Sequence, residues 1–361
     1  MGKRTNTAVW SDKYKRWQVN VQQDGKRRSF YSSTPGRTGQ REANAKADAW
    51  LDNGIENTST KVATLYEDFI TAKKAGTSQS HWRGVVSRWQ NHISPVIGLK
   101  RIDRLSENHL QEVINRAYTE KHLSAKSLQN LRADLVAFMK FCRRAKATTM
   151  MPESLTIPAS ALRPKKRIVQ PRDLIKLFNR DTTIYRGKRI VEPYIHAYRF
   201  EVLSGFRPGE IKGLEWADIV GMEVHLSRAI NVYGEVTQGK NANAVRLYTM
   251  SALAAAEIEA QRKLTGGEKY VFDISTEQTY RKHWLRYLAA NGMAHTTPYE
   301  LRHTFVSIAK KLPEGLVKSL VGHSQSMDTF GVYGHAVEGE AADTAQRVND
   351  LFSDILQKPT T

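Results

Sequence analysis

The sequence has very little cysteine and no long apolar stretch. Cys142 is the only cysteine among 361 residues, so no intrachain disulfide and no zinc cluster of thiolates can form. No run of about 18 apolar residues occurs, and the first residues, MGKRTNTAVWSDK, lack the apolar core of a signal peptide. These absences favour a soluble intracellular protein, which we expect in the cytoplasm and not at a membrane.

Two kinds of catalytic machinery are also missing from the sequence. It contains no Walker motif for holding ATP and no clustered acidic motif for holding a pair of metal ions. We therefore expect chemistry that uses neither a metal ion nor another cofactor.

Positive charge, by contrast, is in large excess. Lys and Arg total 55 against 36 Asp and Glu, which gives a net charge of +19 and a pI near 9.9. Such a surplus favours binding to a polyanion, most commonly a nucleic acid. A solvated basic surface, or one that meets acidic lipid, is the alternative. The length and the hydrophobic fraction of 40% allow two or three domains with cores of their own.

Residues 1–58 predict a small basic domain built on a three-stranded sheet. Trp17–Val21 alternates as a half-buried strand does, Asp24-Gly25 is a hairpin signal, and Arg28–Tyr31 supplies the return strand. We expect another short strand over Ala8–Trp10 and a helix over Ala43–Leu51.

A basic sheet of this kind can lie in a DNA groove. The candidate DNA contacts are Arg16, Lys26, Arg27 and Arg28. A stabilising subdomain with an incidentally basic surface is the alternative, and we favour DNA binding because the charge and the expected fold agree.

Residues 61–147 predict a helical domain, and residues 148–167 predict a linker. Apolar residues recur at helical spacing in four groups, near residues 65–70, 82–89, 110–114 and 128–139. The linker contains Pro152, Pro158 and Pro164 without periodicity. Its basic end, Lys165-Lys166-Arg167, could close around DNA. A plain solvated tether is the alternative.

Residues 168–361 predict a third domain that is mainly helical. Helices are expected over residues 174–178, 194–203, 252–264 and 278–290, with a break after 203 and a restart at Pro208, and strands over 224–231 and 245–250. The whole chain is therefore expected to be mostly α with small β elements.

Five short stretches of this third domain contain residues suited to phosphate chemistry. Thr297-Pro298-Tyr299-Glu300 has the form of a helix start, which places Tyr299 and Arg302 on one face of a first turn that favours an anion. Arginines, polar donors and a lone tyrosine around such a site suggest attack on a phosphodiester. The stretches are GFRPGEIKGLEW with Arg207 and Glu210, TQGKNANAVRLYTM with Lys240, YELRHTF with Arg302, LVGHS with His323, and FGVYGH with Tyr333.

In this order and spacing the stretches resemble those of the tyrosine recombinases, the family of phage and transposon integrases. The resemblance implies that Arg207 and Arg302 clamp the nonbridging oxygens of a DNA phosphate. It implies that Tyr333 is the nucleophile and that Lys240 protonates the leaving group. His323 would hydrogen-bond the phosphate or position the tyrosine. Glu210 would support an arginine or a histidine.

One position departs from the family pattern. The family usually has histidine where this chain has Tyr299, and a neutral phenol is a poor proton acceptor near neutral pH. We interpret Tyr299 as a hydrogen-bond donor to the phosphate, with His323 or water taking the proton. His303 lies on the same side of the helix and is expected to be a packed structural histidine.

The resemblance also implies a function and partners. It implies a site-specific recombinase, an integrase of a phage or other mobile element, that cuts and rejoins double-stranded DNA through a 3′-phosphotyrosyl intermediate. The expected partners are core-type and arm-type DNA sites, three further copies in a homotetramer, an excisionase and a DNA-bending host protein, in the nucleoid of a bacterial cell. The alternatives are a type IB topoisomerase-like enzyme and a non-catalytic DNA-binding regulator. The helical tail, residues 337–356, would dock on a neighbouring subunit or pack on its own domain.

Overall fold

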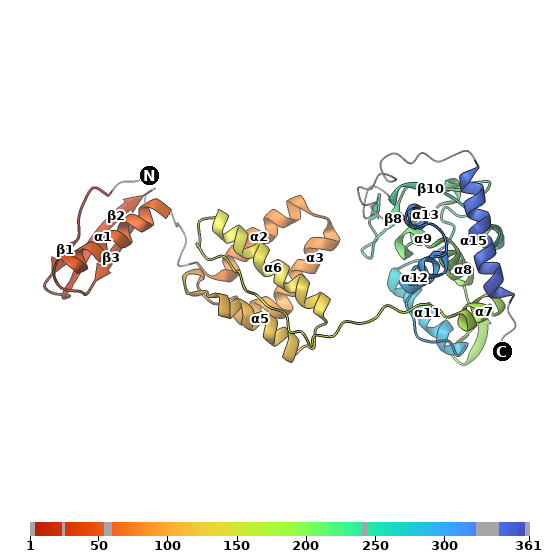
Figure 1. The fold of residues 1–361 in the computed structure, drawn as a ribbon, viewed down its shortest axis with the longest axis horizontal. Coiled ribbons are helices and arrows are strands. Elements are labelled where there is room, and N and C mark those ends of the chain that lie inside the picture. The colour runs from red at the N-terminus through yellow and green to blue at the C-terminus, as the bar shows by residue number, and fades with distance from the viewer. Residues whose placement is uncertain (1–3, 24–25, 54–59, 240–243, 323–338, 358–361) are drawn as a thin grey trace. The chain divides into compact units, whose positions relative to one another are not determined.

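The computed structural model describes residues 4–23, 26–53, 60–239, 244–322 and 339–357 (Figure 1). The chain divides into two compact units, residues 1–164 and 165–361. Helices predominate and the sheets are small, which confirms the predicted fold class. Across the described ranges, no helix combines the length and the apolar character needed to cross a bilayer.

The first unit begins with the three-stranded antiparallel sheet that the sequence predicts. Its strands are β1 (Val9–Ser11), β2 (Arg16–Gln23) and β3 (Lys26–Ser32), in that order. Helix α1 (Gly36–Asn53) packs on one face over a small core of Ala8, Val19, Val21, Ala43, Ala47 and Leu51. The helix begins earlier than the predicted Ala43. The prediction missed its first turns because they are polar and carry no apolar periodicity.

The rest of the first unit is a helical bundle with its own core. Its helices are α2 (Val62–Gly76), α3 (Gln79–Arg88), α4 (Ser94–Ile97), α5 (Glu107–Thr119) and α6 (Ala125–Arg144), with a π-helical turn over Trp89–Ile93 and a 3₁₀ turn over Ile102–Arg104. Tyr66 stacks on Trp89 in this core, with ring centroids 3.7 Å apart. All four predicted groups of apolar residues lie on these helices.

Much of the predicted linker packs against this bundle. Leu155 and Ala161 are buried in the helical core. The carboxylate of Glu107 accepts hydrogen bonds from the backbone of residues 153 and 154, and the Gln111 side chain bonds Thr156 in both directions. The prolines therefore mark an extended segment that is attached to the bundle, which the absence of periodicity alone could not distinguish from a free tether.

The second unit surrounds one buried helix, α8 (Ile195–Ser204). Almost every residue of α8 is buried, including Arg199 and Glu201, and the helix contacts α10 and α12. The other helices are α7 (Pro171–Asn179), α9 (Pro208–Gly213), α10 (Ala252–Thr265), α11 (Glu277–Ala290), α12 (Pro298–Ala309), α13 (Glu314–Val321) and α15 (Glu340–Leu356), with a 3₁₀ turn over Trp216–Asp218.

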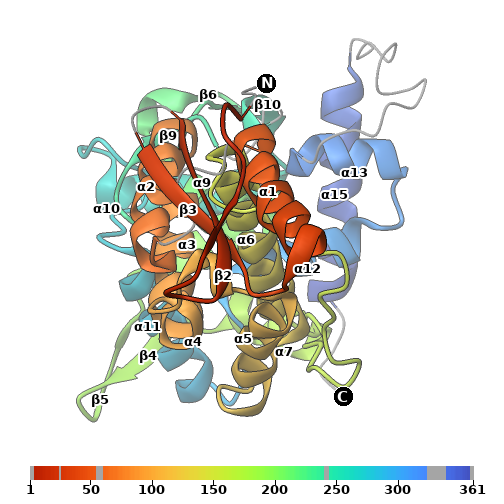
Figure 2. The same cartoon turned by 90° about the vertical axis from the view of Figure 1, so that its left-hand side faces the viewer.

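Short strands complete this unit. The strands β6 (Ile219–Val220), β7 (Glu223–Leu226) and β10 (Arg246–Thr249) form an antiparallel sheet in the order β10-β7-β6. Between β7 and β10, β8 (Ala229–Ile230) pairs with β9 (Val236–Thr237). The single strand predicted over residues 224–231 is therefore divided into β7 and β8. A further hairpin, β4 (Thr182–Tyr185) with β5 (Lys188–Val191), was not predicted; β4 contacts α11, and the hairpin projects from there (Figure 2).

Helix α15, the described part of the predicted tail, packs on its own unit. Phe352 is fully buried and stacks on Phe305 of α12, with centroids 6.2 Å apart. The Asn349 side chain accepts a hydrogen bond from the backbone N–H of Leu253, at the start of α10. These contacts make α15 part of the core that supports α12.

Candidate active site

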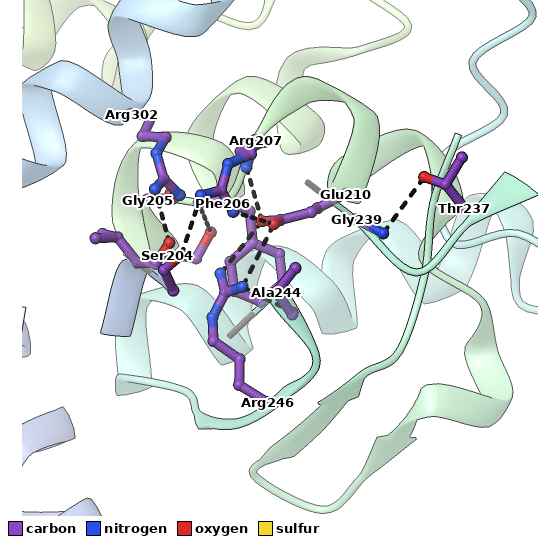
Figure 3. Close-up of polar contacts among 12 residues, drawn as sticks. Ser204, Gly205, Phe206, Arg207, Glu210, Thr237, Gly239, Ala244, Arg246 and Arg302 are labelled. Atoms are coloured by element: carbon purple, nitrogen blue, oxygen red, sulfur yellow. Dashed lines mark hydrogen bonds and ion pairs between the residues drawn. The ribbon is translucent and has the colours of Figure 1, made fainter. Parts of the chain in front are cut away.

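Arg302 is placed by a helix start of the predicted form. Thr297 caps α12, Pro298 occupies its first turn, and Glu300 accepts a hydrogen bond from the backbone N–H of Thr297 at 2.7 Å. This capping arrangement fixes where α12 begins. Arg302 therefore points from the first turns of α12 toward the end of α8 (Figure 3).

The Arg302 side chain is buried and is held by backbone oxygens. Nη1 donates to the carbonyl of Gly205 at 2.7 Å, and Nη2 donates to the carbonyl of Val321 at 2.6 Å. Gly205 has a left-handed backbone (φ 68°), and a Cβ there would lie 2.4 Å from the Phe305 ring, so only glycine fits. In the described part of the chain no carboxylate pairs with Arg302 within 4.0 Å. The guanidinium thus has no direct counter-charge there.

Arg207 is the N-cap residue of α9, where Pro208 restarts the helix as predicted. Its backbone N–H and its Nη1 donate to the two carboxylate oxygens of Glu210, at 3.0 and 2.6 Å. Its Nη2 donates to the carbonyl of Gly322 at 3.1 Å. The structure therefore places Glu210 as the partner of Arg207, and its supporting role in the reaction stays a prediction.

A third arginine, Arg246, belongs to the same cluster and was missed in the sequence. Its Nη1 and Nη2 approach the Glu210 carboxylate at 3.4 and 3.2 Å, and its Nε donates to the carbonyl of Leu320 at 2.9 Å. Arg246 shares a strand face with the buried Tyr248, two residues on. A cation on the buried face of a strand was the signal that could have revealed it.

Burial and charge set the ionisation of this cluster. Burial, followed by repulsion from Arg207, lowers the pKa of Arg302 to about 10. Burial opposes ionisation of Glu210, but attraction and hydrogen bonds from Arg246, with Arg207, leave its pKa below the ordinary value. One carboxylate among three guanidinium groups leaves an excess of positive charge in a site shielded from water, and such a site favours an anion.

Tyr299 and His303 lie together on the exposed side of α12. The Tyr299 side chain is 44% exposed, and its ring meets the His303 ring edge-on at 5.1 Å. Partial burial, followed by the charge of Lys166, lowers the pKa of His303. The structure therefore gives Tyr299 a hydroxyl open to solvent and His303 a packed ring. Whether either takes part in proton transfer stays a prediction.

Three of the predicted site residues cannot be placed. Lys240, His323 and Tyr333 lie outside the described residues. The described neighbours of the first two are Gly239, which follows β9, and Gly322, which ends α13. The structure thus brings together Arg207, Glu210 and Arg302 and adds Arg246.

The predicted DNA contacts of the sheet divide between its two faces. Arg28 is paired with the buried Val21, so it lies on the face that α1 covers. Arg27 is exposed and paired with Gln22, and Arg16 lies over the Tyr31 ring at 3.8 Å, on the open face. The side chain of Lys26 lies outside the described part of the structure.

The basic end of the predicted linker is attached to the second unit. The backbone N–H of Arg167 donates to Glu300 at 2.9 Å, and its Nη1 donates to the carbonyl of His295 at 3.2 Å. Lys165 and Lys166 are exposed beside it. These three cations therefore lie close to the start of α12, the helix of Arg302.

Comparison with known proteins gives a consistent result. Residues 176–340, the range that contains the arginine cluster, match the model of the phage integrase family. The "Tyrosine recombinase XerC-like" protein of Caldanaerobacter subterraneus subsp. tengcongensis is 22% identical, over 98% of this chain and 100% of that protein.

Solved structures share the fold. The Tn1549 transposon integrase in complex with transposon right-end DNA has a TM-score of 0.64 at 18% identity, covering 80% of this chain and 99% of that one. A lambda integrase tetramer bound to a Holliday junction has a TM-score of 0.59 at 13% identity, covering 91% and 98%.

The family match and the XerC-like relative support an enzyme of the tyrosine recombinase class. Within that class, residues 176–340 of this chain match the phage integrase family. The resemblance inferred from the sequence is confirmed.

Proposed function

We propose that the protein is the integrase of a mobile element, which cuts and rejoins double-stranded DNA through a covalent bond to Tyr333. The observation that carries the proposal is the convergence of Arg207 and Arg302. These side chains come from separate helices, and both donate to carbonyls at the end of α13. Two guanidinium groups in one buried, cationic site suit the nonbridging oxygens of a phosphodiester, whose charge grows as it is attacked.

The proposed reaction balances without an external energy source. The Tyr333 hydroxyl gives its proton to His323 or water, its oxygen attacks the phosphorus, and the bond from phosphorus to the 5′ oxygen breaks. Lys240 gives a proton to that oxygen, which leaves as a hydroxyl. A 5′ hydroxyl of another strand then attacks the phosphotyrosine in the reverse sense. One phosphodiester is lost and one is formed, so the strand is rejoined without ATP. His323 is proposed to hydrogen-bond the phosphate or to position Tyr333.

Tyr299 is proposed to donate its hydroxyl proton in a hydrogen bond to the same phosphate. Its exposed side chain lies one turn before Arg302 on α12, which supports this role. His303 is proposed to hold the Tyr299 ring through the edge-on contact at 5.1 Å and not to act as a base.

The first unit is proposed to hold the enzyme on its sites. The open face of the sheet carries Arg16, Arg27, Gln18 and Asn20, and Asn and Gln amides match the edge of adenine in the major groove. This face suits an arm-type site, and the helical bundle suits a core-type site. Lys165 and Lys166, which belong to the second unit, are proposed as further phosphate contacts.

The likeness to a tetrameric lambda integrase on a Holliday junction supports action as a tetramer. Integration and excision would then be directed by an excisionase and a DNA-bending host protein, and the enzyme would work at the bacterial nucleoid.

A trapping experiment tests the proposal. DNA fragments from the ends of the host element, each with a nick beside the cleavage position, are incubated with the full chain, and protein–DNA adducts are isolated under denaturing conditions. We expect an adduct from the wild type and none from Tyr333→Phe. A wild type that binds these fragments without forming an adduct would favour a non-catalytic regulator. Relaxation of supercoiled plasmid without recombination of two-site plasmids would favour a topoisomerase.

A further inference from the structure

Three different arginines hold the last three carbonyls at the end of α13. Arg246 Nε donates to Leu320, Arg302 Nη2 to Val321 and Arg207 Nη2 to Gly322, at 2.9, 2.6 and 3.1 Å. The final carbonyls of a helix have no partner within the helix, and they form the negative end of its dipole. The end of α13 and the arginine cluster therefore fix each other.

Arg246 has a place in this cluster that the other two arginines lack. It contacts the α13 end directly, and it also contacts Glu210, the carboxylate that holds Arg207 (Figure 3). Its side chain is only 9% exposed, and its guanidinium lies 5.0 Å from the centre of the Phe206 ring, beside Arg207. Arg246 Nη1 also donates to the carbonyl of Ala244, two residues earlier in the chain, at 3.1 Å.

We propose that Arg246 is a positioning residue, which sets the direction of the Arg207 guanidinium through Glu210 and fixes the end of α13 through the carbonyl of Leu320. Arg246 thereby couples three elements: the α9 start, the β10 strand and the end of α13. The Arg246 side chain makes four hydrogen bonds to described residues of the protein, whereas those of Arg207 and Arg302 make two each, so Arg246 acts on the phosphate through Arg207 and not by contact. This inference rests on the proposed strand cleavage.

The charges explain why a third arginine is needed. Arg207 and Arg302 repel each other. The Glu210 carboxylate, which is in direct contact with Arg207, offsets this repulsion. Glu210 is almost fully buried, so its carboxylate needs more than one cationic partner to remain ionised. Without Arg246, Arg207 would be the one cationic partner left to the Glu210 carboxylate among the described contacts. The Arg207 guanidinium would then lose its fixed direction.

The test measures single-turnover cleavage of a nicked substrate by the full chain, together with the DNA dissociation constant. We expect Arg246→Met to cleave about 10 to 100 times more slowly, because small misplacements of a catalytic group have effects of ~10²-fold. DNA affinity should stay within about twofold. Arg246→Lys should recover part of the rate, since it restores the charge but not the fork.

A matched control and a double variant separate positioning from general stability. Arg228→Met removes another part-buried ion pair of the same unit, to Asp218 at 2.6 Å, and should cleave at the wild-type rate. If Arg246 acts through Glu210, the losses in Arg246→Met and Glu210→Gln should be far from additive in the double variant. Hydrogen exchange at residues 320–322 should speed up in Arg246→Met.

Several results would overturn the proposal: cleavage by Arg246→Met within twofold of the wild type, a loss of DNA affinity that accounts for the whole loss of rate, or an equal loss in Arg228→Met. A wild type that forms no adduct would instead defeat the proposed function and any catalytic part for Arg246. Unchanged hydrogen exchange at residues 320–322 would overturn only the part of the proposal in which Arg246 fixes the end of α13.

Discussion

The two cationic regions of this protein differ in how the charges are held. In the second unit, Arg302 is 1% exposed and has each of its terminal nitrogens on a backbone carbonyl. On the open face of the N-terminal sheet, Arg27 is exposed and Arg16 rests on the Tyr31 ring. The first region fixes the direction of every donor, whereas the second leaves its charges largely in water.

This difference corresponds to two kinds of work on the same polyanion. A reaction needs donors that are already aimed where charge develops, and burial strengthens them because water does not screen them. Binding along a duplex gains from released counterions and tolerates flexible, hydrated cations. We therefore expect substitutions in the cluster to change rates, and substitutions on the sheet to change affinity and its dependence on salt.

The largest effect is expected from Arg302→Lys. Lysine keeps the charge but lacks the planar guanidinium that the Gly205 and Val321 carbonyls hold in place, so one aimed N–H donor to the phosphate is lost. We expect cleavage of a nicked substrate to slow by about 10²- to 10³-fold, the usual effect of removing one such donor. DNA affinity measured on the same substrate serves as the control. A variant that cleaves within threefold of the wild type would contradict the comparison.

The next largest effect is expected from Glu210→Gln, and it concerns stability. Removing one partner from a buried ion pair leaves the others uncompensated, and we expect the free energy of unfolding to fall by about 3 kcal/mol. The pKa of Glu210 in the folded protein lies below its ordinary value. The stability that its charge contributes is therefore fully present when the pH is above the ordinary pKa, and it is lost as the pH falls through the folded pKa.

Urea unfolding of the wild type and of Glu210→Gln, compared from pH 7 down to about pH 3.5, checks this sign. The gap between the two stabilities should narrow toward acid. A gap that stays constant would mean that the charge of Glu210 is not what stabilises the cluster.

A smaller effect is expected at Tyr299. Tyr299→Phe keeps the ring contact with His303 and removes only the hydroxyl, so cleavage should weaken by about tenfold, the lower end of the value of one hydrogen bond to a charged group. Tyr299→His should keep or raise the rate. Suicide-substrate cleavage measures both variants, and a phenylalanine variant as fast as the wild type would disprove the donor role.

The smallest effect is expected on the sheet. Arg27→Ala should weaken binding to arm-type DNA a few-fold and reduce the slope of log K against log salt by about 0.9, the contribution of one phosphate contact. Arg28→Ala is the matched control, because pairing with Val21 places it on the face that α1 covers. Equal salt slopes for the two variants would mean that the open face does not meet DNA.

Prediction from the sequence succeeded where a local rule was sufficient. The capping pattern around Thr297 and Glu300 and the restart at Pro208 depend on neighbouring residues only, and both appear as expected. It missed Arg246, because nothing near a strand arginine indicates a partner on another element. It also described residues 148–167 only as a linker, because packing against α5 and α6 leaves no periodic trace.

The sequence by itself determined which residue types are available and where helices and hairpins begin, since caps, turns and apolar periodicity act over a few residues. Only the tertiary structure decided that Arg207, Arg246 and Arg302 share the end of α13, with Glu210 between two of them. That arrangement depends on the packing of α8, α9, α12 and β10 around one core. Charges far apart in the chain acquire their direction only when burial leaves them a single set of partners.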